Sequence, residues 1–110
     1  MRRDDLVRVR HMLDAAKEVL SFAKNKSRED LDSDRMLVLS IVKSIEIIGE
    51  AVNRIFKRDK DFKLNNARQI IGTRNRIAHG YDKITDDLIW SIIINSLPKL
   101  KEEVEDLLKQ

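Results

Sequence analysis

The hydrophobic positions of the chain recur at three- and four-residue steps, which is the spacing of one face of an α-helix. The first such segment covers about residues 4–24 and the second about residues 33–57. A polar stretch at residues 25–30 separates them. Ser33 is the expected N-cap of the second segment, with Asp34 favourable in its first turn. The N-terminal half therefore predicts two long amphipathic helices.

The C-terminal half continues the helical pattern after a polar loop at residues 58–66. A third helix is expected over residues 66–79, and a fourth opens at Thr85, a good N-cap. Pro98 removes a backbone donor and must kink or restart that helix before the last amphipathic stretch, residues 100–109. No strand pattern competes. The prediction is an all-α chain forming one domain over residues 1–110, an antiparallel four-helix bundle with or without a fifth short helix after Pro98.

Composition narrows the chemistry. The chain has no Cys, which excludes disulfides and thiolate metal sites, and its two His argue against a zinc site. No apolar run reaches the ~20 residues that a membrane helix needs, and the N-terminus lacks an apolar signal core. We therefore expect a cytoplasmic protein with no membrane contact, no metal site and no cofactor.

Charge is unevenly distributed along the chain. The net charge is +3, yet the segment from Arg54 to Arg76 carries +6, from eight basic and two acidic residues, so the remainder sums to −3. A localised basic stretch can attract a polyanion, although a solvated surface gives the same pattern. Within this segment Arg76, Arg68 and Lys63 are candidate RNA-binding residues.

Functional side chains concentrate at the end of the third predicted helix. Arg74 offers a fork of donors suited to phosphate oxygens, Asn75 an amide, His79 a group that exchanges protons near neutral pH, and Tyr81 a hydroxyl. Metal-free RNA cleavage needs a base for the ribose 2′-hydroxyl, a proton donor for the leaving oxygen and positive charge at the phosphate. These residues could supply that chemistry.

Helical geometry complicates their convergence. Asn75 and His79 share a face, but Arg74 and His79 point about 140° apart at ~100° per residue. They meet if Arg74 wraps around the helix, if the helix ends near His79 with Gly80 as its C-cap, or if two copies of the helix face each other in a symmetric dimer. A histidine at a helix C-terminus also favours its protonated form. The sequence is compatible with all three arrangements.

The segment RNRIAHGY, residues 74–81, resembles the Arg-x4-His-x-Tyr motif of the HepT-like family of HEPN domains. Residues 45–55 are similar to the second-helix signature of this family and residues 69–81 to its third-helix signature. The Leu97-Pro98 step also sits where the family places one. The resemblance covers essentially the whole chain.

This resemblance implies a HEPN-type homodimer whose two motifs line a shared cleft. It implies a toxin that acts as a metal-independent endoribonuclease, with Arg74, Asn75 and His79 as catalytic residues. It also implies a partner, a minimal nucleotidyltransferase antitoxin, which silences the toxin by transferring AMP from ATP to Tyr81. A phosphate there would occupy the place of an RNA phosphate and repel the polyanion.

Two other functions stay open: a non-catalytic partner subunit of a nucleotidyltransferase that binds nucleotide, and a purely structural helical dimer. Glu46 and Glu50 could orient Arg74 across the bundle, but a solvated face with ion pairs to Lys43 and Arg54 is the favoured interpretation. Gly49, inside the second helix, is costly unless a close helix crossing needs it.

Overall fold

The computed structural model describes residues 2–62, 64–78 and 86–109, and these residues form helices with no strand among them. The helices are α1 (Arg3–Ala23), α2 (Asp30–Ser33), α3 (Arg35–Arg58), α4 (Ala67–Ala78), α5 (Asp86–Ser91), a π-helical turn (Ile92–Ser96) and α6 (Leu97–Leu108). The predicted all-α class is confirmed, and the four long predicted segments correspond to α1, α3, α4 and the run from α5 to α6.

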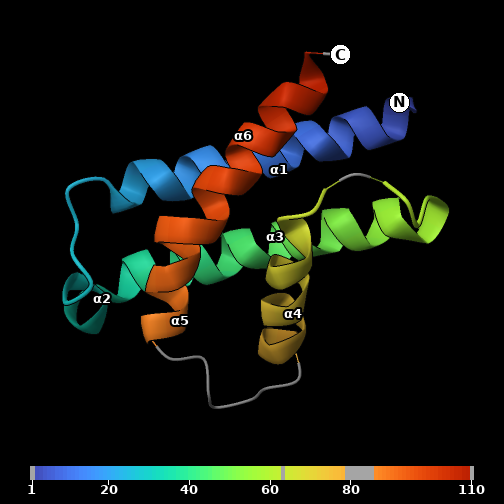
Figure 1. Ribbon diagram of the computed structural model, residues 1–110. Helices are drawn as coiled ribbons and strands as arrows, with labels where there is room; N and C mark the ends of the chain where they lie inside the picture. Colours follow the sequence, from blue (N-terminus) through green and yellow to red (C-terminus); the bar gives the residue numbers. More distant parts are fainter. Residues whose placement is uncertain (1, 63, 79–85, 110) are drawn as a thin grey trace.

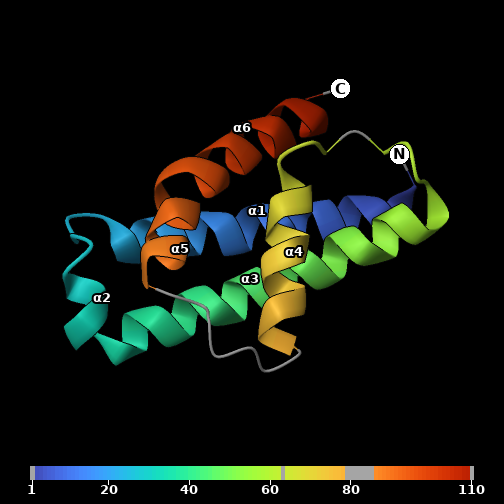
Figure 2. The same ribbon diagram turned by 60° about the horizontal axis from the view of Figure 1, so that its bottom comes forward.

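The helices form two antiparallel pairs (Figure 1). α1 and α3 lie side by side and run in opposite directions. α4 lies across α3, and the run from α5 to α6 returns in the direction opposite to α4 (Figure 2). α6 crosses over α1 as α4 crosses over α3, so the apolar faces of all four segments meet between them.

The core is aliphatic. Leu64, in the turn between α3 and α4, is buried although its neighbours are polar, and Trp90 packs at the edge of the core. The side chains with no more than 1% exposure include Val9, Met12, Val19, Ile41, Ile45, Ile48, Ile55, Leu64, Ile70, Ile92, Leu97, Leu100 and Val104. Burial of this apolar surface is the main stabilising term for such a bundle.

The expected N-cap of α3 was wrong. The N-cap of α3 is Asp34, whose side chain accepts a hydrogen bond from the backbone N–H of Leu37 at 3.0 Å. Ser33 instead ends the short helix α2, and its hydroxyl donates to the carbonyl of Asp30 at 3.4 Å. The sequence pattern did not predict α2, because four residues are too few to show a helical period.

Pro98 lies in the first turn of α6, where the missing N–H is not needed. The turn before it is π-helical, and the N–H of Leu97 bonds to the carbonyl of Ile92. The restart at Pro98 was therefore predicted, but α6 begins at Leu97 rather than at residue 100, and the wide turn was not foreseen. Thr85 and Gly80, the expected caps, lie outside the described residues.

Candidate active site

The site is built where α4 crosses α3. Gly49 of α3 is buried, and an ideal Cβ placed on it would lie 2.7 Å from both Cβ and Cγ of Arg74 on α4. Real Cβ atoms do not come this close to other carbons, so only glycine permits this crossing. The expectation that Gly49 serves a close helix crossing is confirmed. The stem of Arg74 is thereby pressed onto the backbone of α3.

Two further contacts hold α4 in place. The carboxylate of Glu103 on α6 accepts the backbone N–H groups of Asn65 and Asn66, each at 3.1 Å, just before α4 begins. The hydroxyl of Ser96, in the π-helical turn, donates to the side-chain oxygen of Gln69 at 2.9 Å. These bonds join residues 27 to 38 positions apart in the chain, so no local pattern could have shown them.

The guanidinium of Arg74 is held by two acceptors. Its Nη2 lies 3.3 Å from Oε2 of Glu50 on α3, and its Nη1 donates to Oδ1 of Asn75 at 3.3 Å. The other oxygen of Glu50 accepts from Nε of Arg54 at 3.0 Å. The Arg74 side chain is 31% exposed, so part of its donor fork still faces solvent. The protein therefore orients the Arg74 guanidinium, and the exposed donors of this group can still bind an anion.

Glu50 carries its charge readily in this setting. The hydrogen bond from Arg54, with the nearby charges of Arg54 and Arg74, lowers the pKa of Glu50 below its ordinary value, against a smaller opposing effect of desolvation. The expected ion pair with Arg54 is present, whereas the expected ion pair with Lys43 is not found among the described residues. The additional bond to Arg74 means that the favoured interpretation, a merely solvated face, was incomplete for Glu50.

A cleft of about 460 Å³ opens beside Arg74. Its other walls are Arg8 and His11 of α1 and the α3 face that carries Lys43, Ile47 and Arg54. Sequence reasoning missed this cleft, because α1 and α3 approach only through the antiparallel packing of the fold. Its volume is within the range of small-ligand sites.

The remaining predicted site residues divide into two groups. Arg76 is exposed on α4, and the guanidinium of Arg68 lies 4.9 Å from the centre of the Phe56 ring, a cation–π distance that ties its head to α3. Lys63, His79 and Tyr81 lie outside the described residues. The structure thus brings together Arg74 and Asn75 and adds Glu50, while the convergence of Arg74 with His79 stays a prediction.

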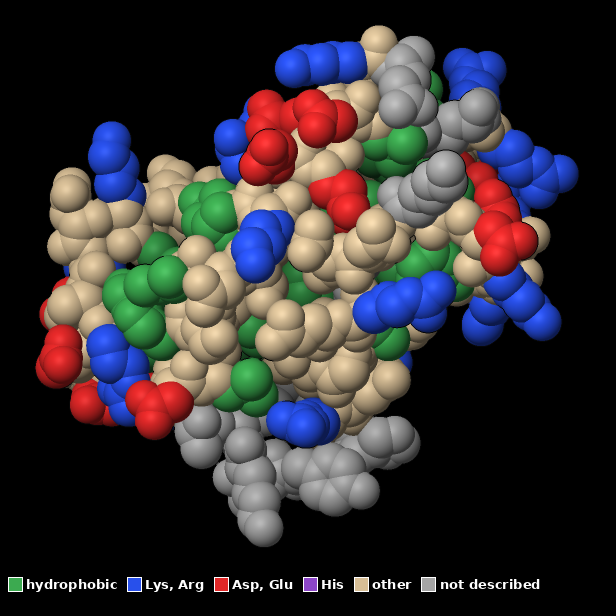
Figure 3. Space-filling view, in the orientation of Figure 1, with side chains coloured by type: hydrophobic (Ala, Val, Ile, Leu, Met, Phe, Trp, Pro, Cys, Tyr) green, Lys and Arg blue, Asp and Glu red, His purple; other side chains and the backbone are tan. Residues whose placement is uncertain are grey.

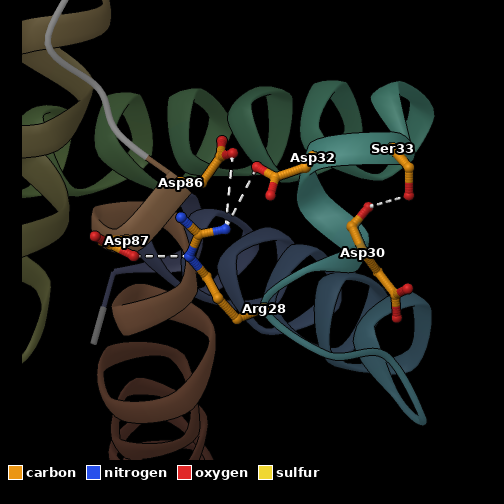
Figure 4. A network of polar contacts seen from close by, with 6 residues as sticks. All are labelled: Arg28, Asp30, Asp32, Ser33, Asp86 and Asp87. Carbon is orange, nitrogen blue, oxygen red and sulfur yellow. Dashed lines mark hydrogen bonds and ion pairs between the residues drawn. The ribbon is translucent and has the colours of Figure 1, made fainter.

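A second polar network lies at the start of α5 (Figure 4). Arg28, in the turn before α2, lies 2.7 Å from Asp87, 3.9 Å from Asp86 and 3.5 Å from Asp32. The hydrogen bond to Asp87 raises the pKa of Arg28. The neighbouring carboxyl, as a hydrogen-bond partner, raises the pKa of Asp86 and lowers that of Asp32. This network fixes α5 to the α1–α2 connection.

Surface charge does not form a single basic track on the face drawn in Figure 3. Acidic side chains gather over α6, and the Lys and Arg side chains there stand apart from one another. In the part of the chain that the structure describes, no group of three or more His, Cys, Asp or Glu side chains could hold a metal ion. Among the same residues, no helix is long and apolar enough to cross a membrane.

Comparison with known proteins extends these observations. Residues 12–107 match the family model described as ribonuclease HepT-like. "Putative RNase MJ1380" of Methanocaldococcus jannaschii is 32% identical over 96 residues, covering 86% of this chain and 87% of that protein. "Putative RNase TTE0752" of Caldanaerobacter subterraneus is 32% identical, with 91% and 90% covered.

A third relative, "Probable ribonuclease HepT" of Thermococcus cleftensis, is 25% identical over 99% of this chain and 100% of that protein. No solved structure matches the chain significantly. The family model covers most of the chain, and two of these relatives match it along nearly their full length at more than 30% identity. The chain therefore belongs to the HepT-like ribonuclease family.

Proposed function

We propose that the protein is a metal-independent endoribonuclease in which Arg74 binds the scissile phosphate and His79 transfers protons. The observation that carries this proposal is the partly exposed guanidinium of Arg74, which lies at the wall of a cleft and is hydrogen-bonded to Glu50 and Asn75. A fixed, partly exposed guanidinium is suited to the charge that develops on a phosphate during cleavage. Relatives named as ribonucleases support the same activity class.

The chemistry follows from the groups present. The 2′-hydroxyl of a ribose attacks the adjacent phosphorus, the bond to the 5′-oxygen of the next nucleotide breaks, and a 2′,3′-cyclic phosphate forms. His79 moves a proton in this step, and Arg74 stabilises the equatorial oxygens of the phosphate. Asn75, whose side-chain oxygen already accepts from Arg74, positions either His79 or the substrate.

We further propose that the protein acts as a homodimeric toxin whose two motifs share one cleft. Its antitoxin is a minimal nucleotidyltransferase that attaches AMP to Tyr81. In that step the tyrosine oxygen bonds to the α-phosphorus of ATP, pyrophosphate leaves and the hydroxyl loses its proton. The added phosphodiester would lie two residues from His79 and compete with RNA for the same cations.

Cleavage of RNA in excess EDTA tests the activity. Purified, mass-verified unmodified protein should cut RNA, whereas folded Arg74→Ala and His79→Ala variants should not. A folded parent that leaves RNA intact would contradict the proposal and favour a non-catalytic partner subunit of a nucleotidyltransferase. Incubation with ATP and the antitoxin should add the mass of one AMP to the parent and none to Tyr81→Phe.

A further inference from the structure

The cleft beside Arg74 has walls from three helices that lie far apart in the sequence. Arg8 and His11 come from α1, Lys43 and Ile47 from α3, and Arg74 from α4. Arg74 is itself part of the wall, so whatever enters the cleft lies next to the guanidinium assigned to the scissile phosphate. Its volume of about 460 Å³ suits a ligand of nucleotide size.

The walls carry an excess of positive charge. Four cations, Arg8, Lys43, Arg54 and Arg74, face two carboxylates, Glu46 and Glu50, giving +2 with His11 neutral. Glu50 is already bound by Arg54 and Arg74, so its charge is largely compensated inside the protein. The cleft is therefore electrostatically suited to an anion.

The cations differ in whether the protein already pairs them. Arg8 lies 3.4 Å from the buried carboxylate of Asp5, and Arg54 is bound to Glu50. Within the described part of the chain, no carboxylate oxygen lies within 4.0 Å of the Lys43 ammonium. Arg28, by comparison, has three carboxylates within 4.0 Å of its guanidinium. Among the described residues, Lys43 is therefore a wall cation without an ion pair, and Glu46, three residues along the same helix, is the unpaired carboxylate of that wall.

One wall is apolar and exposed. Ile47 has 41% of its surface accessible, which is high for a large aliphatic residue, and Ala51 lies one turn further along α3. Such a wall can cover the face of a ribose or base. Lys43 lies one turn before Ile47 on the same face of α3. A cation next to an exposed apolar side chain is the combination that a nucleotide, as opposed to a free phosphate, would use.

We propose that this cleft is a subsite for the nucleotide adjacent to the scissile phosphate of an RNA strand. Lys43 contacts its backbone phosphate, and Ile47 packs against its sugar or base. This assignment rests on the proposed ribonuclease function and deepens it, because it places the strand along α3 rather than along the predicted residues Arg76, Arg68 and Lys63.

Binding of a 2′-O-methyl RNA oligonucleotide, which cannot be cleaved through its 2′-oxygen, tests the subsite. The dissociation constant is measured by fluorescence anisotropy over a series of salt concentrations for the parent, Lys43→Ala, Ile47→Ala and the control Lys99→Ala. Lys99 is an exposed lysine on α6, away from the cleft. Circular dichroism verifies that each variant is folded.

Lys43→Ala should bind about fourfold more weakly at ~0.15 M salt and lower the slope of log K against log salt by about 0.7, the loss of one single-strand phosphate contact. Ile47→Ala should bind more weakly with an unchanged slope, and Lys99→Ala should match the parent. Equal affinities and slopes for Lys43→Ala and Lys99→Ala would overturn the subsite.

The two proposals fail in different ways. RNA cleavage in EDTA together with a Lys43→Ala variant that binds like the parent would sink the subsite and leave the ribonuclease standing. Binding that depends on Lys43, from a parent that never cleaves, would sink the ribonuclease and leave a nucleotide-binding cleft. A parent that neither binds nor cleaves would overturn both.

Discussion

Gly49 of α3 and Arg74 of α4 are in direct contact, so that a Cβ on Gly49 would lie 2.7 Å from the Cβ of Arg74. The requirement for glycine is steric, since Gly49 lies inside a regular helix. This contact connects the packing of the bundle to the proposed chemistry. Gly49, which lets the two helices approach, therefore also sets the position of the Arg74 side chain.

Replacing Gly49 with alanine should therefore destabilise the protein, although Gly→Ala inside a helix ordinarily stabilises. The added methyl group must displace Arg74 or α4, at an expected cost of about 1–3 kcal/mol. Gly72→Ala is the matched control, because a Cβ placed on Gly72 would meet no neighbouring element of the described chain within 4 Å, and it should stabilise by up to about 1 kcal/mol. Urea unfolding of both variants measures the difference; equal stabilisation by both would contradict the close crossing.

The bond between Glu50 and Arg74 should affect activity more than stability. Both side chains are partly exposed, so loss of the ion pair in Glu50→Gln should cost under about 1 kcal/mol of unfolding free energy. Cleavage should slow by about tenfold, because Arg74 would sample more orientations. Glu50→Asp should recover less than the full rate. A Glu50→Gln enzyme with the parent's kcat and KM would remove the positioning role.

Acid should release Arg74 from Glu50. The folded-state pKa of Glu50 is lowered from 4.5, so its contribution to stability is fully present above pH 4.5 and is lost as the pH falls through the lower folded value. Between pH 3 and 6, the parent should therefore lose more stability on acidification than Glu50→Gln does. Thermal unfolding over this range measures both, and parallel curves would contradict the ion pair.

Glu103 should matter for stability through α4. Its carboxylate accepts two backbone N–H groups ahead of that helix, and among the described residues the neighbouring Glu102 makes no such contact. Glu103→Ala should cost about 1 kcal/mol, as loss of a helix cap does, and Glu102→Ala should cost almost nothing. Chemical denaturation of the two variants makes the comparison. The prediction is lost if they unfold at the same denaturant concentration.

Removal of Arg28 should leave Asp32, Asp86 and Asp87 facing one another. The folded-state pKa of Asp32 is lowered, so its contribution to stability is present above its ordinary pKa of 3.8 and is lost as the pH falls. The folded-state pKa of Asp86 is raised, so its contribution to stability is present at low pH and is lost as the pH rises through the folded value. Arg28→Ala should therefore be most destabilised near neutral pH and low salt, where all three carboxylates are charged and unscreened. A destabilisation independent of pH and salt would contradict this origin.

The helices were predictable because apolar spacing reflects burial on one face, and α1, α3, α4 and α6 follow it closely. The features that were not predicted are too short to show a helical period. α2 is a four-residue helix, and Asp34 rather than Ser33 caps α3 because α2 occupies the preceding residues. The π-helical turn before Pro98 covers only Ile92–Ser96, which is also too short to show a period of its own.

The site was predictable only in part. Arg74 and Asn75 stood out by their chemistry and by a family motif that resides in one segment. Glu50 lies 24 positions away and was ambiguous between a solvent-facing and a supporting role until its distance to Arg74 was known. The cleft with Lys43 and His11 arises only from the antiparallel packing of α1 and α3.

Chemical rescue of Arg74→Ala tests whether the guanidinium of Arg74 stabilises the phosphate during RNA cleavage. Arg74→Ala should cleave RNA in EDTA at least about 100-fold more slowly than the parent. Free guanidinium at millimolar concentration should restore part of that rate, and it should not restore His79→Ala. Cleavage by a folded Arg74→Ala variant at the parent's rate, without guanidinium, would show that the Arg74 guanidinium has no part in catalysis.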